Sequence, residues 1–244
     1  AYIRLEPIPE ICHSRAIENP PLVITADGWG AFRDFEHDRP EDIYKKLEEI
    51  PEGEPLKMLI WGNGIGDWCN YPTRVGSYFG TQYDTLVNER GTRMMMRNIR
   101  LWKKEGWNSM QIMRDYTRKR GWEFQVYIRM QGFGVLYPRG MLETSDFFDN
   151  HPEYHCRDRE GRQLSRLSYA HPEVQEHILA LINEISSYDP DGICLSFTRG
   201  LPLVAYEPIM IEGFQKRYGL DPRQLQETDS RWLDFVAEVT TEFV

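Results

Sequence analysis

The stretch Tyr188–Pro208, YDPDGICLSFTRGLPLVAYEP, predicts a buried strand that lies between two turns. The Asp-Pro-Asp-Gly run at 189–192 is typical of a turn that ends a helix. The side chains of the residues that follow alternate between the two faces of a strand, with Ile193 and Leu195 on one face and Ser196 on the other. Ligands of parallel α/β sheets bind just beyond the carboxyl ends of the strands. The residues after this strand are therefore candidates for a binding site: Thr198, Arg199, Tyr206 and Glu207.

On both sides of this strand, the rest of the chain alternates strands with helices. Further strands are predicted near 22–27, 57–62 and 123–130, and helices are predicted near 41–50, 92–105, 109–120, 171–187, 208–218 and 230–244. The long segment Gln131–Ala170 is predicted to be a functional loop. This order predicts an α/β fold, namely a (β/α) barrel of the TIM type. The chain would hold about four βα units, which is an N-terminal half or a partial barrel.

The domain organisation follows from the same pattern. Residues 1–20 are predicted to be an irregular lead-in, and 21–244 a single barrel-type domain. A truncation of this domain at its C-terminus is one interpretation of the pattern. Half of a barrel has two strand edges without a neighbour. We therefore expect a missing C-terminal half or a second copy of the chain to cover these edges.

Composition narrows the class of partner. With 244 residues and a net charge of −9, the chain lacks the basic surplus that nucleic-acid binding requires. It contains no apolar run long enough to cross a membrane. The four cysteines are scattered and form no CxxC pair, so they leave the compartment open. A secreted or periplasmic location is favoured over a cytoplasmic one, since a chain that begins without Met can have lost a signal peptide.

Several phrases of the sequence resemble the TIM-barrel glycoside hydrolases and the related family-10-like glycosyl hydrolase-like proteins of bacteria. The resemblance extends from about Pro20 to Val244, and it is carried by these pieces: Asp27-Gly28-Trp29, His151–Tyr154, Asp158–Gly161, His171–Val174, Tyr188–Ile193, Tyr206–Pro208, Phe214–Asp221 and Trp232. It implies hydrolysis of a glycosidic bond in an oligo- or polysaccharide by two carboxyl groups, without a cofactor.

The sequence departs from that family at the end of the fourth strand, where many members have a carboxylate and this chain has Ser196. Glu207 is then the nearest candidate for the catalytic carboxylate, with Arg199 close in sequence to hold an anion or a sugar hydroxyl. The second carboxylate of many families lies in the second half of the barrel. The alternative to a hydrolase is a saccharide-binding or scaffolding module that has lost the carboxylate of the fourth strand.

Each candidate residue also has a structural interpretation. Glu207 can be an acid/base catalyst or a glutamate that the helix dipole favours ahead of Pro208. Arg129 and Arg199 can bind substrate or form a salt bridge, and Asp27 can contact a ligand or form an Asp-Gly turn. The rings of Trp29, Trp61 and Trp68 can stack on sugar or pack loops against the barrel rim. The predicted cleft comprises Asp27, Trp29, Trp61, Arg129, Arg199, Tyr206 and Glu207.

No metal site is predicted. His151 and His155 are four residues apart, as two ligands on one helical turn would be, but no third ligand follows at a telling spacing. The glycine-rich phrases NGIG and QGFG lack the ending of a phosphate-binding loop. The sequence also contains no nucleophile elbow of the G-x-S-x-G type.

Overall fold

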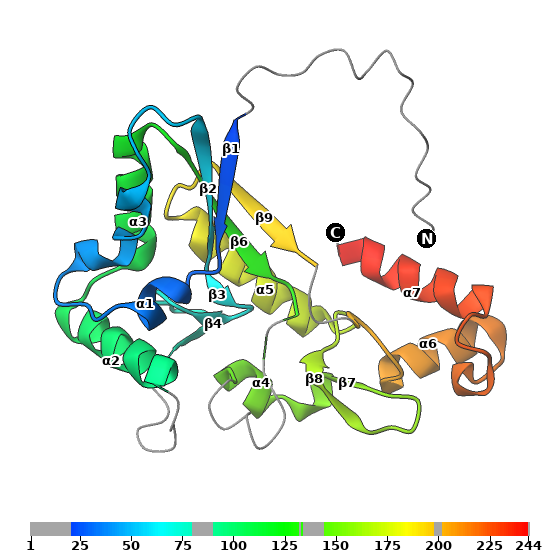
Figure 1. Ribbon diagram of the computed structural model, residues 1–244. Coiled ribbons are helices and arrows are strands. Elements are labelled where there is room, and N and C mark those ends of the chain that lie inside the picture. Colours follow the sequence, from blue (N-terminus) through cyan, green and yellow to red (C-terminus); the bar gives the residue numbers. More distant parts are fainter. Residues whose placement is uncertain (1–20, 80–89, 132, 134–143, 198–201, 244) are drawn as a thin grey trace, which may run out of the picture.

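The computed structural model describes residues 21–79, 90–131, 133, 144–197 and 202–243. Its centre is a parallel sheet of four strands in the order β1-β2-β6-β9, and the chain is a mixed α/β protein (Figure 1). The strands are β1 (Leu22–Ala26), β2 (Leu56–Gly62), β6 (Glu123–Arg129) and β9 (Gly192–Ser196). All four predicted strands are confirmed. Within the described residues the sheet stays open, because β1 and β9 each pair on one side only.

The two faces of the sheet differ because strand side chains alternate. The register places Ala26, Trp61, Val126 and Ile193 side by side on one face, where Trp61 and Val126 are buried. The other face carries mixed side chains, among them Thr25, Ile60, Gln125, Tyr127 and Arg129. The continuous apolar face is the more deeply buried of the two.

Three helices follow the predicted pattern. They are α2 (Arg90–Glu105), α3 (Ser109–Arg120) and α5 (Pro172–Ser186). The side chain of Asn108 accepts hydrogen bonds from two backbone N–H groups of the first turn of α3, and Gly121 ends that helix at φ 69°. The buried stripe of α5 consists of Val174, Ile178, Leu181 and Ile185.

The structure differs from the prediction in two segments. The helix predicted at 41–50 is two short 3-10 turns, η2 (Pro40–Tyr44) and η3 (Leu47–Glu49). Ile50 is already extended there, because Pro51 disfavours a helical residue before it. The predicted loop Gln131–Ala170 contains α4 (Asp146–Asn150), η5 (Pro152–Tyr154) and the hairpin of β7 (His155–Arg157) and β8 (Gln163–Leu167). These elements lie beyond the arrowheads of β6 and β9 in Figure 1.

Shorter elements complete the fold. The helix α1 (Gly30–Asp34) follows β1, and a small sheet of β3 (Gly64–Ile65), β4 (Trp68–Cys69) and β5 (Ser77–Tyr78) follows β2. In the C-terminal part, α6 (Pro208–Tyr218) and α7 (Ser230–Phe243) lie where helices are predicted, and η6 (Pro222–Gln224) lies between them. Trp232 of α7 packs against Phe214 of α6. No helix in the described ranges is long and apolar enough to cross a membrane.

Candidate functional site

A cavity of about 700 Å³ lies at the carboxyl ends of the four parallel strands. Residues from both faces of the edge strand β1 line it, so the cavity extends around the second half of that strand. The lining includes Thr25, Asp27, Ile60, Trp61, Tyr127, Arg129, Cys194 and Ser196. Three residues of the predicted cleft, Asp27, Trp61 and Arg129, are thus brought together here.

Asp27 and Arg129 are the charged pair of this cavity. The Asp27 Oδ1 atom accepts hydrogen bonds from the backbone N–H groups of Trp29 at 2.9 Å and Gly30 at 3.2 Å. Its Oδ2 atom lies 3.9 Å from Arg129 Nη2, which is too long for a hydrogen bond. Asp27 therefore forms the turn after β1 with one oxygen and faces the Arg129 cation with the other. These contacts agree with the turn interpretation, and the ligand contact stays a prediction.

Gly62 permits this approach across the intervening strand β2. A Cβ atom at Gly62 would lie 2.6 Å from the backbone oxygen of Asp27 and 3.0 Å from the ring of Tyr127. Real side chains do not tolerate such contacts, so a larger residue would push the ends of β1 and β6 apart. The Tyr127 hydroxyl accepts a hydrogen bond from Arg129 Nη2 at 3.4 Å.

The rings of Trp29 and Trp61 pack against other side chains and do not expose their faces to the cavity. Trp29 is 8% exposed, and its ring packs at 5.3 Å from Trp68 and 4.6 Å from Phe79. Trp61 lines the cavity but is only 2% exposed. A sugar ring needs an accessible aromatic face for stacking, and this arrangement presents none at Trp29 or Trp61. Their roles as substrate contacts stay predictions.

Tyr206 and Glu207 lie outside the lining of this cavity. The Tyr206 ring stacks on Trp232 at 4.9 Å, and the Arg159 guanidinium lies 5.5 Å from its centre. Glu207 is fully buried, its Oε1 atom accepts from the Ser168 hydroxyl, and both oxygens accept from the backbone N–H of Ala205. Through these contacts Glu207 connects the segments that contain Ser168 and Ala205. The catalytic role of Glu207 stays a prediction.

The end of the fourth strand is only partly described. Ser196, which stands where the resemblance implies a carboxylate, lines the cavity beside Arg129 in the sheet register. Arg199 and Thr198 lie outside the described residues. The sequence reasoning missed Tyr127 as a cavity residue. Its signal was present, because Tyr127 and Arg129 alternate on the same face of one predicted strand.

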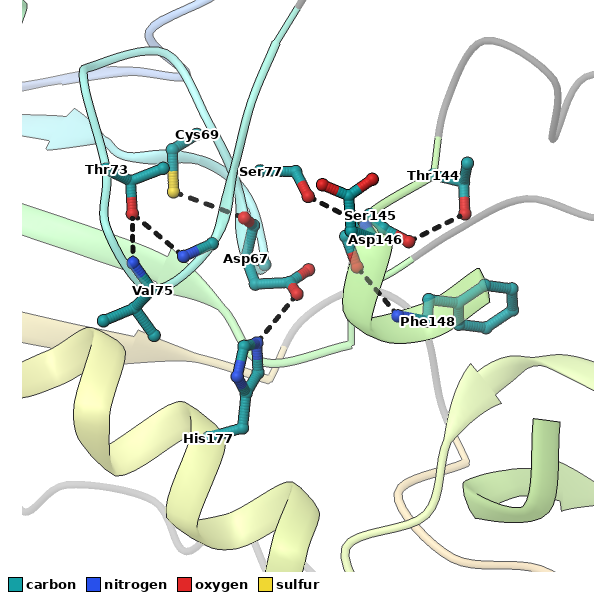
Figure 2. A network of polar contacts seen from close by, with 12 residues as sticks. Asp67, Cys69, Thr73, Val75, Ser77, Thr144, Ser145, Asp146, Phe148 and His177 are labelled. Atoms are coloured by element: carbon teal, nitrogen blue, oxygen red, sulfur yellow. Dashed lines mark hydrogen bonds and ion pairs between the residues drawn. The ribbon is translucent and has the colours of Figure 1, made fainter. Parts of the chain in front are cut away.

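A second polar cluster holds the loop 63–79 that follows β2 (Figure 2). The carboxylate of Asp67 is fully buried, and its Oδ2 atom lies 2.8 Å from His177 Nε2 on α5. Burial raises the pKa of Asp67, and the contact with His177 opposes that rise. The His177 ring stacks on Phe147 at 3.8 Å. No sequence signal joins Asp67 and His177, which are 110 residues apart.

Each of the two histidines that are four residues apart contacts a protein oxygen through one ring nitrogen. His151 Nδ1 contacts the Glu153 carboxylate at 2.9 Å, and His155 Nε2 contacts the backbone oxygen of Phe148 at 2.8 Å. Among the described residues, no group of three or more His, Cys, Asp and Glu side chains is arranged to hold a metal ion. Cys69, Cys156 and Cys194 are free thiols.

Comparisons with known proteins find similarity to solved structures only. No family model matches the chain, and no curated protein matches it. Among solved structures, the chain is similar to an alpha-galactosidase from Thermus thermophilus in complex with p-nitrophenyl alpha-D-galactopyranoside, with a TM-score of 0.41 and 17% identity. The match covers 94% of this chain and 37% of the alpha-galactosidase, so the chain spans a little over a third of that enzyme's length. Similarity of this degree assigns neither a reaction nor a site.

Proposed function

We propose that this chain is carbohydrate-active, that it binds a saccharide in the cavity at the carboxyl ends of its sheet, and that it takes part in cleaving a glycosidic bond. The observation that carries the proposal is the pairing of Asp27 and Arg129, 3.9 Å apart at the wall of a cavity of about 700 Å³. A carboxylate that accepts and a guanidinium that donates suit sugar hydroxyls, which do both. Apolar neighbours such as Ile60 suit the C–H face of the ring.

The proposed reaction needs two carboxyl groups. Asp27 is the carboxylate among the lining residues, and its side chain is 49% exposed, so a substrate can reach it. We assign to it the role of nucleophile or base. Glu207 is the candidate acid from the sequence, and its burial requires that the loop before α6 move before the group meets a substrate.

The alternative function is saccharide binding without hydrolysis. Ser196 favours it, because a serine lines the cavity at the end of β9 where the resembled hydrolases have a carboxylate. The two functions share the cavity and differ in the chemistry at Asp27.

The variant Asp27→Asn separates them. Asparagine keeps the side-chain oxygen that accepts from Trp29 and Gly30, so the turn after β1 is expected to persist. If Asp27 is catalytic, hydrolysis of a panel of p-nitrophenyl glycosides falls by roughly a hundredfold or more, while saccharide binding is kept. The matched control is Asp115→Asn, which changes an exposed carboxylate that pairs with Arg114, and neither residue lines the cavity.

Three results decide between the proposals. Hydrolysis by the chain that Asp27→Asn abolishes and Asp115→Asn spares supports the hydrolase. Saccharide binding by an unaltered chain that hydrolyses none of the panel supports the binding module. A chain that binds no saccharide contradicts both.

A further inference from the structure

Arg129 brings a guanidinium to the cavity with unused donors. Its side chain is 17% exposed and lies among the lining residues. Both of its contacts, to the Tyr127 hydroxyl at 3.4 Å and to Asp27 Oδ2 at 3.9 Å, involve the same nitrogen, Nη2. In the part of the chain that the structure describes, Nε and Nη1 have no partner. These donors are therefore available to a ligand in the cavity.

The shape of the guanidinium selects the ligand group. Nη2 and Nε together form one edge of the guanidinium plane, and Nη2 and Nη1 form another. The hydrogen bond to the Tyr127 hydroxyl uses one of the two hydrogens on Nη2. At least one edge with two parallel N–H donors is therefore available. Such an edge matches the two oxygens of a carboxylate, whereas a sugar hydroxyl takes one donor at a time.

The other charges of the cavity are already engaged. Lys46, the second cation of the lining, pairs with Asp34. Asp27 lies on the Nη2 side of the guanidinium, and its Oδ1 atom is held by two backbone N–H groups. Each two-donor edge includes Nη2, so a carboxylate bound there lies near Asp27, and the positive guanidinium offsets the repulsion between the two anions.

We infer that the saccharide bound in this cavity carries a carboxylate, as a uronic acid residue does, and that Arg129 binds this carboxylate through two parallel N–H donors. The inference rests on the proposed function and names its substrate class. It also assigns Arg129 as the residue that distinguishes an acidic sugar from its neutral counterpart.

Matched sugars test the inference by isothermal titration calorimetry of the full chain. The pairs are glucuronate with glucose and galacturonate with galactose, and acetate serves as a carboxylate without a sugar. We expect one uronate to bind at least tenfold more tightly than its neutral partner and than acetate, with an affinity that falls as salt is added. Arg129→Gln is expected to remove that difference, and Arg129→Lys to remove most of it, because lysine keeps the charge but lacks the planar edge.

The control variant is Arg118→Gln, which makes the same change of charge at an exposed arginine that pairs with Asp189 and does not line the cavity. It is expected to keep the preference for the uronate, and thermal unfolding checks that each variant is folded. A neutral sugar that binds as tightly as its uronate overturns the inference and leaves the saccharide site standing. Acetate that binds as tightly as the uronates overturns the assignment of a sugar acid. Absence of binding by every sugar, neutral and acidic, contradicts the proposed function itself.

Discussion

Asp27 and Glu207 are carboxylates that follow strands of the same sheet and lie in opposite surroundings. The Asp27 side chain is 49% exposed at the cavity, whereas Glu207 is fully buried between the Ser168 hydroxyl and the Ala205 backbone. A buried carboxylate with several donors stabilises the loops that supply them, since each donor would otherwise lack a partner. Substitution of Asp27 and substitution of Glu207 are therefore predicted to have different effects.

Glu207→Ala is expected to lower the free energy of unfolding by about 2–4 kcal/mol, because the Ser168 hydroxyl and the Ala205 N–H then lack an acceptor in a buried site. Urea unfolding followed by circular dichroism measures the loss. The control is Glu212→Ala on the exposed side of α6, expected within about 0.5 kcal/mol of the unaltered chain. Unchanged stability of Glu207→Ala together with lost hydrolysis would instead favour the catalytic role.

At the scale of elements, α5 holds the loop that follows β2. His177 and Glu184 lie two helical turns apart on α5, and both reach into the loop 63–79. His177 meets the buried Asp67, while Glu184 accepts from the Tyr71 hydroxyl at 3.1 Å, the Thr73 hydroxyl at 2.6 Å and the Arg74 backbone N–H at 2.6 Å. The helix α5 thus also fixes the loop that follows β2.

Glu184→Ala is expected to free the segment 71–76 without unfolding the sheet. Three donors lose one shared acceptor, so we expect a loss of about 1–3 kcal/mol and faster hydrogen exchange at the Arg74 amide. Exchange measured by NMR or mass spectrometry resolves the segment. Glu176→Ala, at an exposed position of the same helix, is the control and leaves the exchange of Arg74 unchanged. Protection of Arg74 that survives Glu184→Ala would contradict this role of α5.

At the scale of the whole molecule, buried histidines are spread over the fold. His37 is fully buried, its Nδ1 accepts from the indole N–H of Trp102, and its Nε2–H donates to the backbone oxygen of Ala31. Burial lowers the pKa of His37, and it also lowers the pKa of His155 and His171. The folded chain therefore resists protonation at three separated positions.

We expect stability to fall as the pH is lowered from 7 to 5. In the unfolded chain the histidines take up protons near the usual histidine pKa of about 6.5, while the folded ones do not, so acid favours the unfolded state. Asp67 acts in the opposite direction, because burial raises its pKa and the folded state keeps that proton to a higher pH. The midpoint of thermal unfolding across this range is the measurement, and Asp67→Asn is expected to make the decline steeper. A midpoint that is constant or rises on acidification would refute the expectation.

The open parallel sheet also concerns the molecule as a whole. β1 and β9 have one neighbour each within the described residues, and Leu22 and Val23 of β1 are about half exposed. That a second half or a second copy covers these edges stays a prediction, which the molar mass in solution compared with 28.8 kDa would test.

By itself, the sequence determined the strands, most of the helices and their parallel order, because periodicity and turn chemistry act between near neighbours. It also placed Asp27 and Arg129 at strand ends, where a parallel sheet brings ligand residues together. The tertiary structure decided which candidates meet. Asp27 and Arg129 share a cavity because Gly62 lets their strands approach, whereas Trp29 packs into the rim and Glu207 is buried. Contacts such as that between Asp67 and His177 depend on register and loop packing across more than a hundred residues, which local patterns do not encode.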